Sequence, residues 1–173
     1  LYSIKDNMFN NLIELTKVRI GFLVLTTTVI GFYLGAQGNI DYMLLFYTVF
    51  GTLLSSTGSS VMNNVIESES DKLMDRTKNR VLPTKKISIS FAKFLGISFI
   101  FSGLLILYFK VNFLTCVLSI MTIFSYLFLY TPLKRKSWLN TSVGAIPGAI
   151  PPLGGWTAAT NSLEWGGIAV FLI

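Results

Sequence analysis

Residues 42–66 read YMLLFYTVFGTLLSSTGSSVMNNVI, a stretch of 25 residues between Asp41 and Glu67 that contains no charged side chain. A helix needs about 17–25 apolar residues to cross the hydrocarbon core of a membrane. Four more uncharged stretches flank it: 21 residues after Arg19, 16 after Lys93, 23 after Lys110 and 27 after Lys136. A further apolar stretch begins at Trp165. The sequence therefore predicts an all-α, polytopic transmembrane helix bundle with five spans and the start of a sixth.

The composition agrees with a membrane protein and excludes several other classes. Of 173 residues, 52% are hydrophobic and only 13% are charged, whereas a soluble domain carries about 25% charged residues. This balance argues against both a soluble globular domain and a disordered chain. The single cysteine, Cys116, excludes a disulfide scaffold, and the absence of histidine excludes histidine as a metal ligand or general base.

The first uncharged stretch has a second interpretation, a cleavable signal peptide. We favour a membrane span because the stretch is long for the apolar region of a signal peptide. It also contains Thr26, Thr27 and Thr28, and the acidic residues Asp6 and Glu14 precede it.

The distribution of basic residues predicts the orientation in the membrane. The connections expected on one side carry 13 of the 14 Lys and Arg residues, and only Lys110 lies on the other side. Because cytoplasmic connections are enriched in Lys and Arg, we expect the N-terminus and both basic connections to face the cytoplasm or an organelle matrix, in a bacterial or mitochondrial inner membrane. The net charge of +6 then indicates a surface for anionic headgroups or substrates rather than nucleic acid.

The most unusual connection, residues 68–88, is long and dense in charge of both signs, and we expect it to be a functional cytoplasmic loop. Asn63, Glu67, Asp71 and Asp75 recur every four residues and would form one stripe on a helix. Carboxylates at this spacing repel each other, more strongly where they lose water. A Mg²⁺ ion, which takes one or two carboxylates together with substrate phosphate oxygens, would explain the arrangement.

Basic residues at the same spacing, Lys72, Arg76 and Arg80, would form a second stripe able to bind a diphosphate. The alternative is a solvated loop in which acids and bases pair as surface ions. That alternative is weaker for Asn63 and Glu67, because serines and threonines precede them and suggest a helix that faces a cavity rather than lipid. Spacing alone leaves both interpretations open.

Four segments in order along the chain resemble motifs of the UbiA superfamily of intramembrane prenyltransferases, over about residues 12–173. The segment from Asn63 through Glu67 and Asp71 to Leu82 is similar to the first aspartate-rich motif of that superfamily. Its RTKNR continuation resembles the branch that farnesylates protoheme IX. The segments LTKVR at 15–19, YTPLKR at 130–135 and GAIPGAIPPLGGW at 144–156 are similar to other motifs of this branch.

The resemblance implies farnesyl transfer from farnesyl diphosphate to a vinyl group of heme B, giving heme O, with Mg²⁺ as cofactor. It implies catalytic and metal-binding roles for Asn63, Glu67 and Asp71. Further residues are implied to bind the diphosphate: Lys72, Arg76, Arg80, Tyr130 and Lys134. Lys17 and Arg19 are candidate contacts to anionic groups of the substrates. The lipid bilayer, and other membrane proteins of heme synthesis, are the remaining expected partners.

Val18 replaces a proline of the family pattern. Two other departures matter. Glu67 stands where many members have Asp, and the second acidic motif that members have after the sixth span is not among residues 1–173. Members have about nine helices. We therefore expect residues 1–173 to be a single membrane domain that forms the N-terminal part of a longer enzyme and is inactive alone. Two alternatives stay open: a prenyltransferase that acts on an aromatic or quinone precursor, and a small transporter or structural membrane subunit.

Overall fold

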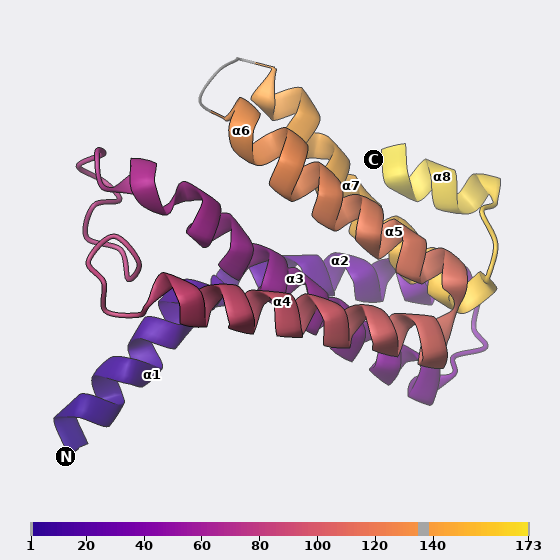
Figure 1. The fold of residues 1–173 in the computed structure, drawn as a ribbon. Helices are drawn as coiled ribbons and strands as arrows, with labels where there is room; N and C mark the ends of the chain where they lie inside the picture. The colour runs from indigo at the N-terminus through magenta and orange to yellow at the C-terminus, as the bar shows by residue number, and fades with distance from the viewer. Residues whose placement is uncertain (1, 135–138, 173) are drawn as a thin grey trace.

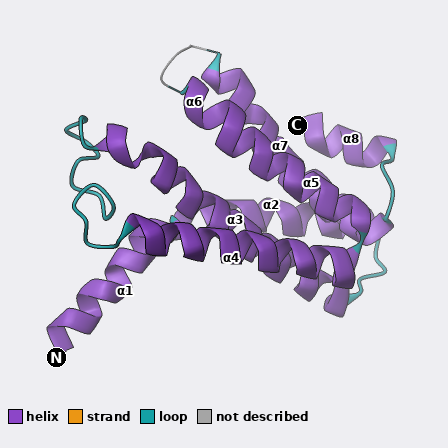
Figure 2. Ribbon diagram, in the orientation of Figure 1, coloured by secondary structure: helices purple, strands orange, loops and turns teal. Residues whose placement is uncertain are grey.

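The computed structural model describes residues 2–134 and 139–172, with side chains described from Met8 onward, and within these ranges it contains helices and no strand (Figure 2). The helical segments follow one another along the chain: α1 (Tyr2–Thr16), α2 (Val18–Ala36), α3 (Tyr42–Asp71), α4 (Ile89–Ile106), η1 (Leu107–Val111), α5 (Phe113–Phe124), η2 (Ser125–Tyr130), α6 (Thr131–Leu133), α7 (Asn140–Thr160) and α8 (Trp165–Leu172). The segments η1 and η2 are π-helical continuations of α4 and α5. The predicted all-α helix bundle is confirmed.

Four helical segments of the described chain are long and apolar enough to cross a membrane: Val18–Ala36, Tyr42–Asp71, Ile89–Val111 and Phe113–Leu133. They correspond to the first four predicted spans. The fifth predicted span forms α7, which has 21 residues but is not among these four apolar segments. Pro147, Pro151 and Pro152 lie inside α7 without ending it. The sixth stretch begins α8 at Trp165, as expected.

Two helix pairs dominate the packing, α3 with α4 and α2 with α7 (Figure 1). Glycine permits the close approach in the second pair. A Cβ atom at Gly31 of α2 would meet the carbonyl of Pro152, and one at Gly155 of α7 would meet the carbonyl of Thr28. Small residues of this kind let helix backbones approach in membranes, where burying apolar surface gives little driving force. The two pairs are joined by direct contact of α2 with α3, and by α5, which packs on α7 and also touches α3.

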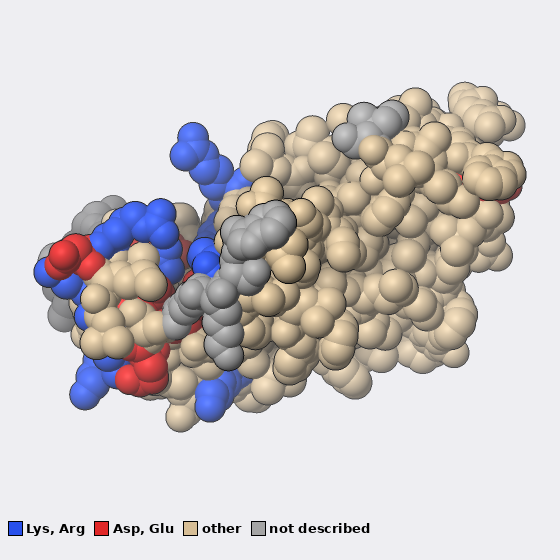
Figure 3. Space-filling view, turned by 90° about the horizontal axis from the view of Figure 1, so that it is seen from above, with Lys and Arg blue, Asp and Glu red and all other residues tan. Residues whose placement is uncertain are grey.

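The charged side chains gather at one end of the molecule, and most of the visible surface elsewhere is uncharged (Figure 3). At about 1.5 Å per residue, the 30-residue helix α3 is longer than the roughly 30 Å hydrocarbon core, so its charged last turns extend past the core. Basic residues from three separate segments, Lys17, Arg80 and Lys134, line one cavity at this end. Arg135 and Lys136, also predicted for this side, lie outside the described residues.

The connection to α4 differs from its predicted bounds. α3 continues to Asp71, so the connection occupies residues 72–88 rather than 68–88. It consists of turns and ends at Ser88, whose hydroxyl accepts a hydrogen bond from the backbone N–H of Phe91 at 3.2 Å and caps α4. The helical stripe predicted to include Asp75 therefore stops at Asp71.

Candidate functional site

The candidate site is built on the last three turns of α3. Asn63, Glu67 and Asp71 are only 2%, 2% and 4% exposed. Residues four apart lie on the same face of a helix, so the three side chains follow one another along a single inward-facing stripe. Two buried carboxylates on one stripe are unfavourable without compensating cations or hydrogen bonds.

Two cations from distant segments compensate these carboxylates. Arg80, from the connection, donates through Nη1 to Asp71 Oδ2 at 2.9 Å and lies 3.9 Å from Glu67 Oε2. Lys134, which follows α6, donates through Nζ to Glu67 Oε1 at 3.2 Å. About one third of each basic side chain is exposed, whereas both carboxylates are buried. The cations therefore lie between the carboxylates and the surface.

A third cation comes from the corner between α1 and α2. Lys17 adopts a left-handed backbone conformation with φ of 50°, and its Nζ donates to Asn63 Oδ1 at 2.6 Å. The next residue of α3 fixes the same corner, because Asn64 Nδ2 donates to the carbonyl of Leu15 at 2.8 Å. Burial lowers the pKa of Lys17 from its ordinary value of 10.5 to about 8, and the nearby Glu67 carboxylate partly offsets that effect.

The far side of the site is formed where α5 continues as the π-helical segment η2. The Thr131 hydroxyl donates to the carbonyl of Tyr126 at 2.7 Å and accepts from Asn63 Nδ2 at 2.9 Å. Asn63 is thus held from both sides, by Lys17 and by Thr131. Tyr126 and Tyr130 stack with ring centroids 5.8 Å apart. Short π-helical segments within α-helices occur often at functional sites.

Many of these residues line a cavity of about 730 Å³ at the charged end of the molecule, although Glu67 and Thr131 are not part of its wall. Its polar wall includes Lys17, Asn63, Asp71, Arg80 and Lys134, and much of the remaining wall is apolar. The apolar lining residues come from α1, α2 and the connection: Ile13, Leu15, Val18, Ile20, Val81, Leu82 and Pro83.

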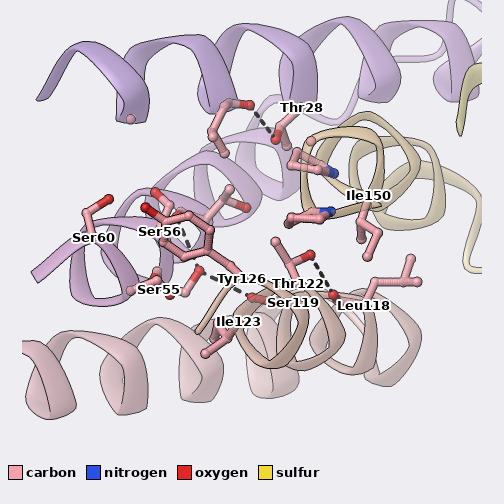
Figure 4. Close-up of a pocket in the computed structure, with 18 of the residues that line it drawn as sticks. Thr28, Ser55, Ser56, Ser60, Leu118, Ser119, Thr122, Ile123, Tyr126 and Ile150 are labelled. Carbon is pink, nitrogen blue, oxygen red and sulfur yellow. Dashed lines mark hydrogen bonds between the residues drawn. The ribbon is translucent and has the colours of Figure 1, made fainter. Parts of the chain in front are cut away.

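A second cavity, of about 280 Å³, lies deeper between the helices (Figure 4). It shares Ile20, Tyr126 and Tyr130 with the first cavity, so the two adjoin at these side chains. Ser55 and Ser119 meet across it with their hydroxyl oxygens 3.2 Å apart (Figure 4). The predicted cavity-facing stripe of α3 is confirmed, because four of its serines line this space: Ser55, Ser56, Ser59 and Ser60.

The other basic residues that were predicted to bind the diphosphate or substrate anions lie in different places. The second stripe predicted for Lys72, Arg76 and Arg80 is wrong, because no helix continues past Asp71. Lys72 instead pairs with Glu69 at 2.7 Å on the exposed surface. Arg76 and Arg19 are exposed and line the larger cavity.

The aromatic residue of the predicted set, Tyr130, lies at the boundary of the two cavities. A Cβ atom at Gly144 of α7 would come within 2.8 Å of its ring, so the glycine leaves room for the tyrosine. Gly148, one turn further along α7, faces open space in the smaller cavity.

Sequence reasoning missed the residues that hold the site in place. Thr77 is buried, and its hydroxyl donates to the carbonyl of Asp71 at 3.1 Å, fixing the connection against the end of α3. Thr131 and Asn64 have comparable roles at the other walls. Thr77 and Thr131 lie inside segments that resemble family motifs, and Asn64 adjoins Asn63. Their position inside these segments is the feature of the sequence from which their roles could have been predicted.

The residues fit a divalent cation of the Mg²⁺ class. Mg²⁺ is bound through one or two carboxylates together with phosphate oxygens, and Glu67 and Asp71 provide two carboxylates one turn apart. Glu67 Oε2 is buried without a hydrogen-bond partner in the described structure, which leaves an oxygen ligand available. The described residues contain no group of three or more Asp, Glu, Cys or His side chains that could hold a metal by themselves. This donor set therefore suits a metal whose other ligands come from a substrate.

Comparison with known proteins shows which family this chain resembles in sequence. The model of the UbiA prenyltransferase family matches residues 24–173. The protoheme IX farnesyltransferase of Solibacter usitatus is 41% identical over 160 residues, which cover 87% of this chain and 55% of the relative. The protoheme IX farnesyltransferase of Aquifex aeolicus is 41% identical over 169 residues, which cover 97% of this chain and 58% of the relative. The protein of the same name from Myxococcus xanthus is 38% identical over 164 residues, which cover 95% of this chain and 55% of the relative. The chain thus spans about half the length of these curated relatives. No solved structure matches it significantly.

Proposed function

Because this chain belongs to the UbiA prenyltransferase family, we propose that it forms the diphosphate-binding part of an enzyme that transfers farnesyl from farnesyl diphosphate to a vinyl group of heme B, giving heme O. The observation that carries the proposal is the buried pair Glu67 and Asp71, which is bound by Arg80 and Lys134 beside the larger cavity that Asp71, Arg80 and Lys134 line. The match to only about half of each relative supports a longer enzyme, of which residues 1–173 are one membrane domain, inactive alone.

The two cavities suit the two parts of an allylic diphosphate. The diphosphate would lie in the larger cavity, where Lys17, Arg80 and Lys134 would bind its oxygens. The prenyl chain would enter the smaller cavity past Tyr126 and Tyr130. There, helices α2, α3, α5 and α7 would keep water from a developing carbocation.

Breaking the bond between the farnesyl carbon and the diphosphate oxygen leaves an allylic cation and a more highly charged leaving group. Arg80 and Lys134 are already oriented by Asp71 and Glu67, so they would stabilise that charge with little rearrangement. Tyr130 would donate a hydrogen bond to a phosphate oxygen. We propose that Glu67 and Asp71, with the Asn63 amide oxygen, hold Mg²⁺, which when bound neutralises leaving-group charge.

The acceptor is proposed from the relatives, each of which is named protoheme IX farnesyltransferase. The 730 Å³ cavity supports a large acceptor, because it exceeds the space that a diphosphate alone would fill. The test is to incubate the full-length protein with farnesyl diphosphate, Mg²⁺ and heme. The product expected by mass spectrometry is a heme that has gained a farnesyl group and a hydroxyl group from water. Prenylation of a small aromatic acid, with heme unchanged, would contradict the proposed acceptor but not prenyl transfer.

We also propose that the charged end faces the cytoplasm or matrix, as the distribution of basic residues indicates. In a Cys116→Ser background, a cysteine that replaces Lys78 should react with an impermeant thiol reagent only from that side. A cysteine that replaces Gln37, at the opposite end of α2, should react only from the other side. Labelling of both positions from one side would contradict the proposed topology.

A further inference from the structure

The cations around the larger cavity fall into two groups. Lys17, Arg80 and Lys134 each contact a polar side chain of α3. Arg19 and Arg76 also line the cavity, but neither has an ion-pair partner among the side chains that the structure describes. Of the exposed lysines of the connection, Lys72 and Lys78 are paired with Glu69 and Asp75.

Charge balance indicates that the first group is sufficient for the diphosphate. Lys17, Arg80 and Lys134, together with the carboxylates of Glu67 and Asp71, give a net charge of one positive. A divalent metal would raise this to three positive. An alkyl diphosphate carries about three negative charges near neutral pH, one more than a phosphate monoester. Arg19 and Arg76 are therefore not needed to neutralise the diphosphate.

Anchored neighbours fix the backbone at both free arginines. Arg19 lies two residues after Lys17, whose side chain is bound to Asn63. Arg76 directly precedes Thr77, which is buried and bonded to the carbonyl of Asp71. The two guanidinium groups thus extend from fixed points on α2 and on the connection, beside apolar cavity walls that include Val18, Leu82 and Pro83.

We propose that Arg19 and Arg76 bind the two carboxylates of the acceptor and take no part in binding the diphosphate. A guanidinium group binds a carboxylate through two parallel hydrogen bonds, which orients the carboxylate as well as attracting it. Apolar walls with two free guanidinium groups suit a large apolar molecule that carries two carboxylates, and heme has this chemistry. The inference rests on the proposed function and adds the residues that select and orient the acceptor.

Glu14 is the one other acid on the wall of this cavity besides Asp71 among the described residues. Its Oε1 accepts a hydrogen bond from the backbone N–H of Val81 at 3.3 Å, so it has a role in holding the connection. It forms no ion pair with Arg19 or Arg76 in the described structure. Both guanidinium groups consequently remain available to an acceptor.

The test measures two affinities in the full-length protein, for heme by its Soret absorption and for farnesyl diphosphate by calorimetry. Arg19→Gln and Arg76→Gln should each weaken heme binding about tenfold, the size expected for a charge-assisted hydrogen-bonded pair, and leave farnesyl diphosphate affinity within about twofold. Lys78→Gln, which removes an exposed paired cation, is the matched control and should change neither affinity.

Heme dimethyl ester, which has lost both carboxylate charges, separates a direct contact from a general effect. The native protein should bind the ester more weakly than heme, and the arginine variants should bind it as the native protein does. Equal losses for heme and its ester, or a larger loss for farnesyl diphosphate than for heme, would overturn the inference. A native protein that binds farnesyl diphosphate but no heme would overturn the proposed acceptor, whereas heme binding that is insensitive to both substitutions would overturn this inference alone.

Discussion

Two sets of paired charges have their acidic residues in the same short segment around the end of α3, and they differ almost completely in environment. Glu67 and Asp71 are buried beneath Arg80 and Lys134, which come from outside α3. The pairs Glu69–Lys72 and Asp75–Lys78 are each formed by residues three apart and lie at the surface. In the sequence, the acidic members of the two sets interleave, but their cations differ in distance: 9 and 67 residues along the chain in the buried set, three in the exposed set.

The difference arises from where α3 ends and which face it buries. Asp71 is the last residue of the helix, so Asp75 leaves the stripe and its side chain is 97% exposed. Exposed ion pairs contribute only about 0–1 kcal/mol, whereas a buried carboxylate that loses its cation is strongly destabilised. The buried set is therefore expected to carry the function, and the exposed set to be nearly dispensable.

The largest expected effect comes from Asp71→Asn. The substitution removes a proposed metal ligand and the partner of Arg80, and it should lower turnover of the full-length protein about a thousandfold or more at saturating Mg²⁺. The measurement is product formation by mass spectrometry, with folding monitored by size-exclusion chromatography in detergent.

Asp75→Asn is the matched control, because it makes the same chemical change four residues away in the exposed set. It should retain turnover within about twofold, as expected for a surface ion pair. Equal activity of the two variants would mean that burial does not distinguish the two sets in function, and that the Asp71 carboxylate takes no part in turnover.

Arg80→Gln should have the next largest effect. It leaves Asp71 buried without its 2.9 Å partner and removes a proposed diphosphate ligand. We expect farnesyl diphosphate affinity to fall about a hundredfold, from the loss of charge-assisted hydrogen bonds to buried groups. Calorimetry would measure this affinity, and Lys78→Gln, which removes an exposed cation, is the control. Unchanged affinity in Arg80→Gln would assign the arginine to neutralising Asp71 only.

The sequence predicts those parts of the arrangement that depend on residues close together in the chain, and it does not predict the contacts between distant residues. Local patterns were sufficient for the apolar spans and for the stripe from Asn63 to Asp71, because helical periodicity and hydropathy act within one segment. The helix end at Asp71 was not predicted, since the KLMD segment that follows, residues 72–75, contains no glycine or proline to mark it. The pairing of Glu67 with Lys134 joins residues 67 positions apart, and only the packing of α5 beside α3 determines it.

Thr131→Val should have a smaller effect, because it removes a neutral hydrogen bond and keeps the shape of the side chain. Asn63 Nδ2 would lose its 2.9 Å acceptor, leaving Lys17 alone to orient the amide. A net loss of about 1–1.5 kcal/mol predicts about tenfold weaker Mg²⁺-dependent binding of farnesyl diphosphate. Thr84→Val is the control, because Thr84 bonds only to carbonyls within its own turn. A Thr131→Val protein with native affinity would show that Asn63 needs no second partner.

The smallest expected effect is a dependence of diphosphate affinity on pH. It arises because Lys17 loses its charge in a pH range where an arginine keeps its own. Burial gives Lys17 a pKa of about 8, so its ammonium group is mostly protonated at pH 7 and mostly neutral at pH 9. A bound anion favours the protonated form, and affinity should therefore fall as the pH rises through 8, by up to about tenfold between pH 7 and pH 9. Lys17→Arg keeps a permanent positive charge at this corner and should flatten the profile, since an arginine does not titrate in this range. The measurement is the affinity for a non-reactive farnesyl diphosphate analogue at several pH values in both proteins. Parallel profiles would show that Lys17 does not contact the anion and acts only on Asn63.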